Sequence, residues 1–85
     1  MTQQYKHSTH PDLVRRLKRA EGHLRRVIGM IEEEQPCLDV ARQLTAVESA
    51  VTAAKRVLIY DHIDHCLDHD EVSVLDEMKA LTKLL

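Results

Sequence analysis

The sequence predicts an all-α fold, with residues 1–85 forming one domain built as a three-helix protomer. Three observations predict it. Hydrophobic residues make up 44% of the chain but aromatic residues only 2%, so Leu, Val, Ile and Ala must build the core. Gly and Pro, the residues that interrupt helices, number only two each. Apolar residues also recur at helical spacings of three and four along most of the chain.

The first predicted helix covers residues 11–34 and follows a flexible, histidine-containing N-terminus at 1–10. Pro11 suits the first helical position, because the N–H that proline lacks would have no partner there. Gln35-Pro36 then interrupts the chain, since helical geometry is disfavoured before a proline. The apolar stripe consists of Leu13, Leu17, Ala20, Leu24, Val27 or Ile28, and Ile31.

The second predicted helix covers residues 36–70, and a short third helix covers 73–85. Leu75, Met78 and Leu81 give the third helix its apolar side. The stripe of the second helix consists of Cys37, Ala41 with Val40, Leu44, Val47, Val51, Ala54 and Leu58. His62 and Cys66 continue this stripe, which indicates that both face a packed seam.

Charge is distributed unevenly along the chain. Residues 1–30 hold seven Lys or Arg against two Asp or Glu, whereas residues 31–85 hold five against twelve. A basic first segment on an acidic body is typical of a protein with a polyanionic partner such as nucleic acid, although a solvated helix face would give the same pattern. The basic residues of the first helix are Arg15, Arg16, Lys18, Arg19, Arg25 and Arg26.

Several function classes are disfavoured. No apolar run approaches membrane length, and the polar start MTQQYKHSTH carries no signal peptide, so we expect a cytoplasmic protein with no membrane partner. In that reducing compartment, the two cysteines favour thiolates with a role, or buried apolar side chains, over a disulfide. No nucleophile–base–orienter set and no glycine-rich phosphate loop is present, so we do not expect an enzyme.

The stretch DHIDHCLDHD, residues 61–70, concentrates side chains that bind metals. His62 and Cys66 are four residues apart on one helix and can hold the same ion. Cys37 is the obvious third ligand, but 25 positions separate it from His62, or about 37 Å along a straight helix. Two antiparallel copies crossing near Ala50 and Val51 would place each Cys37 opposite the other chain's His62. The spacing therefore predicts an antiparallel dimer with two shared metal sites, unless the cysteines are ordinary core thiols and His62 a satisfied interface histidine.

Cys37, His62 and Cys66, behind the basic stretch RRLKRAEGHLRRV, closely resemble the pattern of the CsoR/RcnR family of metal-sensing repressors. The resemblance implies a homodimer or a homotetramer built as a dimer of dimers, which represses a metal-efflux operon and leaves operator DNA when metal binds. It assigns DNA contacts to Arg16 and Arg19, reinforced by Arg15, Lys18, Arg25 and Arg26.

The chain looks most like the nickel- and cobalt-linked DmeR and NreA branch of that family. This resemblance implies Ni(II) as the metal, with Co(II) or Cu(I) as alternatives, and a histidine near the N-terminus as fourth ligand. Either His7 or His10 could serve. Pro36 stands where copper sensors carry a Tyr, which favours nickel over copper.

Two other functions stay open from the sequence. Glu48 stands where the family often carries an Arg, and an acid on a DNA-binding face would repel phosphate. A nickel-binding accessory protein of the same fold, with weak or no DNA binding, is therefore one alternative. The other is a Cu(I) sensor, or a thiol-redox sensor that joins Cys37 to Cys66 of the partner chain.

Overall fold

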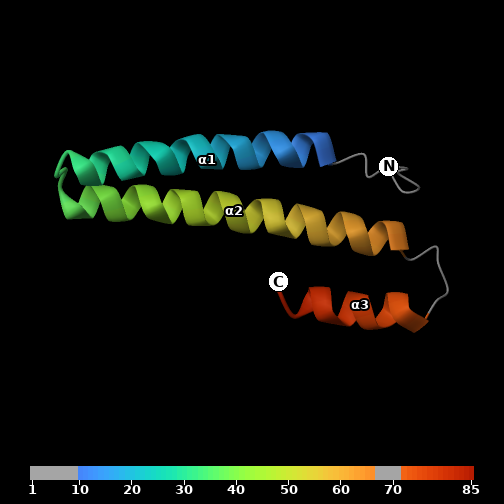
Figure 1. The fold of residues 1–85 in the computed structure, drawn as a ribbon. Helices are drawn as coiled ribbons and strands as arrows, with labels where there is room; N and C mark the ends of the chain where they lie inside the picture. Colours follow the sequence, from blue (N-terminus) through green and yellow to red (C-terminus); the bar gives the residue numbers. More distant parts are fainter. Residues whose placement is uncertain (1–9, 67–71) are drawn as a thin grey trace.

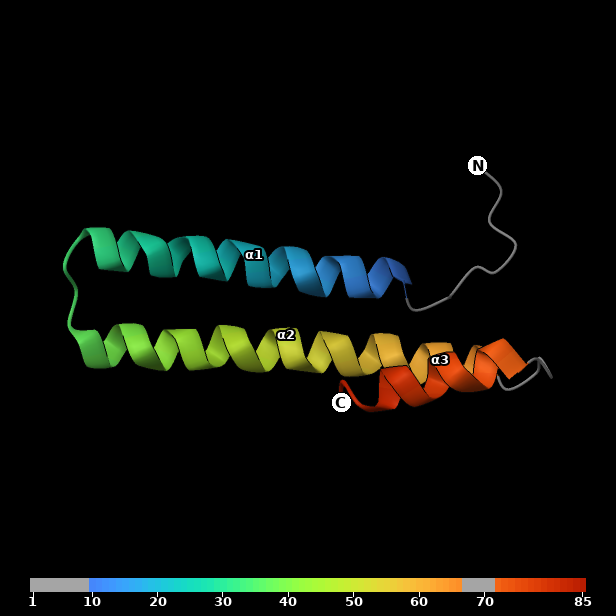
Figure 2. The same ribbon diagram turned by 60° about the horizontal axis from the view of Figure 1, so that its bottom comes forward.

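The computed structural model describes residues 10–66 and 72–85, and the side chains of 64–66 and 72–74 are not described. It contains three helices: α1 (His10–Glu32), α2 (Cys37–Cys66) and α3 (Val72–Thr82). The predicted all-α class is confirmed. Helices α1 and α2 form a long antiparallel hairpin, and α3 runs back along the C-terminal half of α2 (Figures 1 and 2). None of these helices is long and apolar enough to span a membrane.

The core of the hairpin comes from two matching heptad series. Leu13, Ala20 and Val27 of α1 are buried, and so are Val40, Val47 and Ala54 of α2. A spacing of seven residues returns a side chain to nearly the same helix face, so each series lines one side of the α1–α2 seam. Ile59 of α2 is 1% exposed. Among the described residues no polar or charged side chain is buried, so dispersion and the hydrophobic effect hold the hairpin together.

Helix α1 ends two residues before the predicted 34, in a Schellman turn. The Gln35 N–H donates to the Met30 carbonyl (2.9 Å) and the Glu34 N–H donates to the Ile31 carbonyl (3.0 Å). Glu34 is left-handed, with a φ of 57°. Glycine normally occupies this position, because a Cβ crowds the left-handed backbone. The chain offers no glycine there, so the sequence places the end of the helix just before Gln35-Pro36, two residues too late.

Replacing Glu34 by Gly should stabilise the metal-free protein by about 0.5–1 kcal/mol and raise Tm, because the left-handed strain is relieved. The substitution also removes a negative charge from the carboxyl end of α1. Such a charge interacts unfavourably with the helix dipole, so its removal should add to the stability. Thermal unfolding followed by circular dichroism measures the effect. Glu33→Gly is the matched control: Glu33 has no positive φ, so Tm should fall. Equal changes in Tm for the two variants would contradict this interpretation.

Candidate metal site and nucleic-acid-binding face

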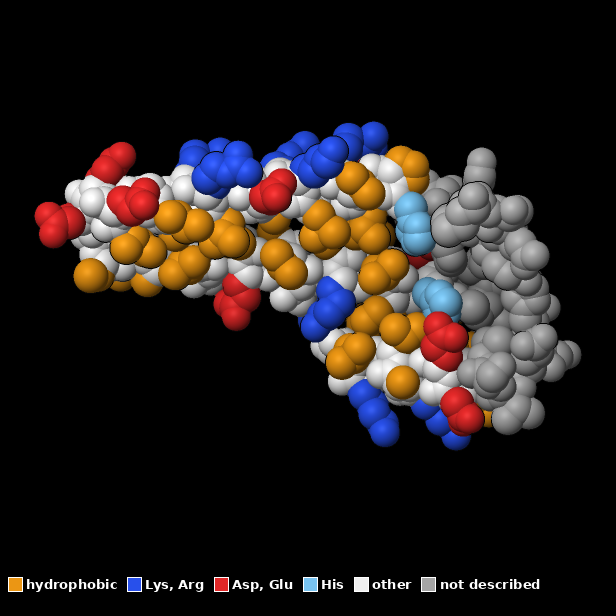
Figure 3. All heavy atoms as spheres, viewed as in Figure 1, with side chains coloured by type: hydrophobic (Ala, Val, Ile, Leu, Met, Phe, Trp, Pro, Cys, Tyr) orange, Lys and Arg blue, Asp and Glu red, His pale blue; other side chains and the backbone are white. Residues whose placement is uncertain are grey.

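A second apolar series lies beside the buried one on both helices of the hairpin. Each member follows a buried residue by four positions, and each is 41–55% exposed. In the space-filling view, hydrophobic side chains form a band across α1 and α2 on one face of the molecule (Figure 3). We call these residues the apolar band: Leu17, Leu24 and Ile31 of α1, with Leu44, Val51 and Leu58 of α2. Contiguous exposed apolar surface of this kind marks an interaction site.

Cys37 lies at one end of this band. It is the first residue of α2 and follows Pro36, whose carbonyl accepts the first hydrogen bond of the helix from Val40 N–H (3.1 Å). Its thiol is free and exposed. Cys37 lines a shallow, mostly apolar hollow together with Ile31, Glu34, Gln35, Val40, Ala41 and Leu44. Cys37 therefore joins the apolar band at the turn between α1 and α2.

His62 lies near the opposite end of α2. Its side chain is 26% exposed, and its Nε2 lies 2.8 Å from Oε1 of Glu77 on α3. An imidazole that donates its Nε2–H to a carboxylate is held in one orientation and in the tautomer whose Nδ1 carries the lone pair. That is the arrangement of a metal ligand supported by a neighbouring carboxylate. Glu77 was not singled out from the sequence, because its contact depends on α3 folding back against α2.

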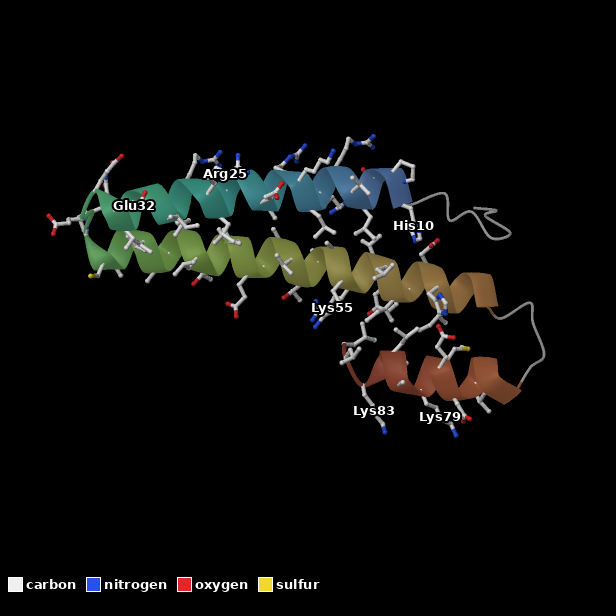
Figure 4. All side chains as sticks on the ribbon, viewed as in Figure 1. His10, Arg25, Glu32, Lys55, Lys79 and Lys83 are labelled. Atoms are coloured by element: carbon white, nitrogen blue, oxygen red, sulfur yellow. The ribbon has the colours of Figure 1, made fainter. Side chains whose placement is uncertain are left out.

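Cys37 and His62 of one protomer lie far from each other. Helix α2 is unbroken from Cys37 to Cys66 over 30 residues, so Cys37 and His62 lie about 37 Å apart along its axis. Among the side chains that the structure describes, no group of three from His, Cys, Asp or Glu is close enough to hold an ion. Cys66 ends α2, but its side chain is outside the described set, and His7 lies outside the described residues. His10 opens α1 and is placed at the end of the hairpin where α2 finishes (Figure 4).

The six basic residues predicted to contact DNA are all exposed on α1. Lys and Arg side chains line the edge of α1 that faces away from α2, where Arg25 is labelled (Figures 3 and 4). This edge is separate from the apolar band. A dimer that covered the band would therefore leave the basic residues open to a polyanion.

Asp12 orders two of these arginines. Its Oδ1 accepts from Arg15 (3.0 Å) and its Oδ2 from Arg16 (2.9 Å). The hydrogen bonds from Arg16 and then Arg15 lower the pKa of the Asp12 carboxyl below its usual value, so it stays charged at neutral pH. The spacings of three and four residues could have predicted this contact from the sequence.

A polar contact also links the two long helices. The His23 ring Nε2 lies 2.6 Å from Oε1 of Gln43. It borders a hollow lined by Arg26, Gly29, Met30 and Glu33 as well. This pair was not singled out from the sequence, because nothing in the pattern indicates that positions 23 and 43 meet.

Comparison with known proteins identifies the family. Residues 9–85 match the model of the family described as metal-sensitive transcriptional repressor. The chain belongs to this family. Its resemblance to CsoR/RcnR proteins is thereby confirmed, and members of the family are transcriptional regulators rather than enzymes. No solved structure matches the chain significantly.

Several curated relatives of the chain are named for copper. A copper-sensing transcriptional repressor CsoR from Mycobacterium ulcerans is 40% identical over 68 residues, covering 74% of this chain and 58% of the relative. The copper-sensing repressor RicR of Mycobacterium tuberculosis is 42% identical over 53 residues, covering 62% and 55%. CsoR of Bacillus subtilis is 34% identical over 73 residues, covering 86% and 71%. The chain thus spans about half the length of the mycobacterial relatives.

These relatives correct the predicted metal. The assignment of Ni(II), drawn from the nickel- and cobalt-linked branch, is wrong, because the similar proteins are named copper-sensing repressors. The donor set predicted from the sequence is consistent with this correction. Two thiolates and one imidazole form a soft, low-coordinate set that suits Cu(I), and the assignment of nickel needed an additional N-terminal nitrogen. Pro36 in place of Tyr was too weak an indication to decide the metal.

Proposed function

We propose that the protein is a Cu(I)-responsive transcriptional repressor. In this proposal a dimer, or a dimer of dimers, binds operator DNA through the basic edge of α1 and leaves the DNA when Cu(I) binds. The metal ligands are Cys37 of one protomer with His62 and Cys66 of its partner. The observation that carries the proposal is the apolar band, which leads along an unbroken α2 from the exposed Cys37 to His62.

A two-fold axis near Val51 accounts for both the band and the ligands. Counting outward from Val51, Leu44 lies seven residues before it and Leu58 seven after it, so each would face the other across the axis. The same axis sets Cys37 opposite position 65 of the partner, between His62 and Cys66. Burial of the band would then remove the exposed apolar surface from water and complete two metal sites.

The residues present fit Cu(I). Thiolates and an imidazole are the ligands that this soft ion prefers, and a bound Cu(I) supplies a strong link between the ends of two α2 helices. The Glu77 carboxylate, 2.8 Å from Nε2 of His62, would hold the ring of this metal-binding histidine in one orientation. The chain's own contribution is therefore to bring the ligands of two protomers together and to orient the ring.

The basic edge of α1 supplies the DNA contacts. Arginine and lysine neutralise phosphates and release counterions, so affinity should fall steeply with salt. Metal and DNA are coupled in this proposal, typically by about 1–3 kcal/mol, and the coupling is reciprocal. Helix α1 packs directly on α2 through the buried heptad series, so a change at the ends of α2 can be transmitted to the basic edge.

The test uses fluorescence anisotropy, under anaerobic conditions, to measure binding to the DNA upstream of the protein's own operon. The metal-free protein should bind this DNA in a salt-dependent manner, and one equivalent of Cu(I) per protomer should weaken binding about 5- to 150-fold. Absence of DNA binding by the metal-free protein would favour an accessory or storage protein. Release by persulfide or oxidant, with no response to Cu(I), would favour a thiol-redox sensor.

Removing the carboxylate partner of His62 should weaken Cu(I) binding without abolishing it. We expect Glu77→Ala to lower Cu(I) affinity about 10- to 100-fold, the range typical when an outer hydrogen-bond partner of a metal ligand is lost. Competition with a chromophoric Cu(I) chelator measures the change. Asp76→Ala is the matched control: it removes the neighbouring exposed acid of α3 and should leave the affinity near wild type. Equal losses in the two variants would mean that general negative charge matters, not the hydrogen bond.

A further inference from the structure

Two oppositely charged side chains flank Val51 on α2. Glu48 precedes Val51 by three positions and Lys55 follows it by four, and both are exposed. At about 100° per residue, both lie on the same side of the helix, about 60° and 40° around the axis from Val51. Lys55 projects from the side of α2 away from α1 (Figure 4). The two residues therefore lie on one rim of the α2 part of the apolar band.

Neither charge has an ion-pair partner among the described residues of its own chain. The two residues are seven positions apart, which places them about 10.5 Å apart along the helix axis, too far for a direct ion pair. The hollow that Glu48 lines is formed by other α2 residues: Ser49, Thr52, Ala53 and Arg56. No α1 residue lines this hollow, so Glu48 is not part of the basic edge of α1.

We propose that Glu48 of one protomer forms an ion pair with Lys55 of its partner, twice in each dimer, and that these pairs select the antiparallel register that completes the metal sites. The inference rests on the proposed two-fold axis near Val51. Measured along α2 of one protomer, Glu48 lies about 4.5 Å from the two-fold axis. Position 55 of the partner lies about 6 Å from that two-fold axis, in the same direction. The mismatch is one residue rise, well within the reach of Glu and Lys side chains.

Charge complementarity distinguishes this register from its neighbours. A slip of one helical turn would move Glu48 away from the partner's Lys55 and would bring Cys37 out of line with His62. An ion pair at the rim of an interface adds little to the affinity between the protomers. It acts on specificity, because an arrangement that brings like charges together is disfavoured. The pair also gives Glu48 a role other than weakening DNA binding. When the Glu48 carboxylate is paired with the partner's Lys55, its negative charge is neutralised and repels DNA phosphates less.

The pair is tested with two single charge reversals, Glu48→Lys and Lys55→Glu. Each homodimer would place like charges together, whereas a mixed dimer would have both pairs attractive. Equal amounts of the two metal-free variants, one carrying a mass tag, are mixed to equilibrium and weighed by native mass spectrometry. Random pairing gives one half mixed dimers. We expect about four-fifths or more to be mixed at low salt, falling toward one half at high salt because the charges are screened.

Arg42→Glu provides the matched control. It makes the same change of charge on α2 as Lys55→Glu, but about 180° around the helix from Val51. Paired with Glu48→Lys, it should give fewer mixed dimers than Lys55→Glu does. Random pairing of Glu48→Lys with Lys55→Glu would overturn the ion pair while leaving the shared metal site intact. A monomeric wild-type protein would instead overturn the proposed function itself, so the two failures are distinguishable.

Discussion

Replacing Val51 by Glu should convert the protein into a monomer and abolish tight Cu(I) binding in the same step. Val51 is 45% exposed in the protomer and lies at the centre of the α2 part of the apolar band. Under the proposed two-fold axis it meets its own copy, so the substitution would bury two unpaired carboxylates against each other. Dissociation separates Cys37 from the partner's His62. Each protomer alone then has too few ligands at the site to bind the ion tightly.

Sedimentation velocity and chelator competition measure the two losses together. Ser49→Glu is the control for charge alone, because Ser49 is exposed and lies about 160° around the helix from Val51. It should remain dimeric and bind Cu(I). Circular dichroism checks that the Val51→Glu protomer stays helical. If this variant were monomeric and still bound Cu(I) with wild-type affinity, the site would lie within one chain, against the geometry of α2.

Replacing Cys37 by Ser should separate metal sensing from DNA binding. Cys37 is exposed at the start of α2 and lies outside both buried heptad series, so its loss should leave the fold and the dimer intact. Cu(I) affinity should fall by more than the roughly 10- to 100-fold expected for an outer hydrogen-bond partner, because a direct ligand is lost. The variant should therefore bind operator DNA like wild type and stay bound when Cu(I) is added.

Anisotropy titration of this variant with and without Cu(I) gives the answer. Thr45→Ser on the exposed side of α2 is a conservative control that should respond to Cu(I) normally. Normal release of Cys37→Ser from DNA by Cu(I) would remove Cys37 from the site. Loss of DNA binding before any metal is added would instead show that Cys37 supports the DNA-binding conformation itself.

Periodicity predicted the helices well because the hairpin is simple. Spacings of three and four residues identified α1, α2 and α3, and Gln35-Pro36 located the turn between the first two. The single stripe expected on each long helix proved to be two adjacent ones. The buried series, such as Val40 and Val47, packs within the protomer, whereas the exposed series, such as Leu44 and Val51, does not. Hydrophobicity alone cannot separate the surface that packs within a chain from the surface left for a partner.

The candidate site was predicted only in part. Arithmetic on helix rise indicated that Cys37 and His62 of one chain cannot hold the same ion, and α2 is the unbroken helix on which that argument depends. The contact between His62 and Glu77 could not be predicted, because it depends on the tertiary packing of α3. The metal was predicted wrongly, since the nickel assignment came from a resemblance to the nickel- and cobalt-linked branch and from Pro36 in place of Tyr, whereas the similar proteins are named copper-sensing repressors. Two thiolates and an imidazole describe the soft donor set more directly.

The central claim is that two protomers share each metal site, and a complementation experiment tests it most directly. Cys37→Ala lacks the ligand of one side, and His62→Ala lacks a ligand of the other. Each variant alone should bind Cu(I) weakly. In a mixed dimer, however, Cys37 of the His62→Ala chain meets His62 of the Cys37→Ala chain, and one complete site returns. Purified mixed dimers should therefore bind one tightly held Cu(I) each, measured by chelator competition, whereas mixed dimers with no tight site would contradict a site shared between protomers.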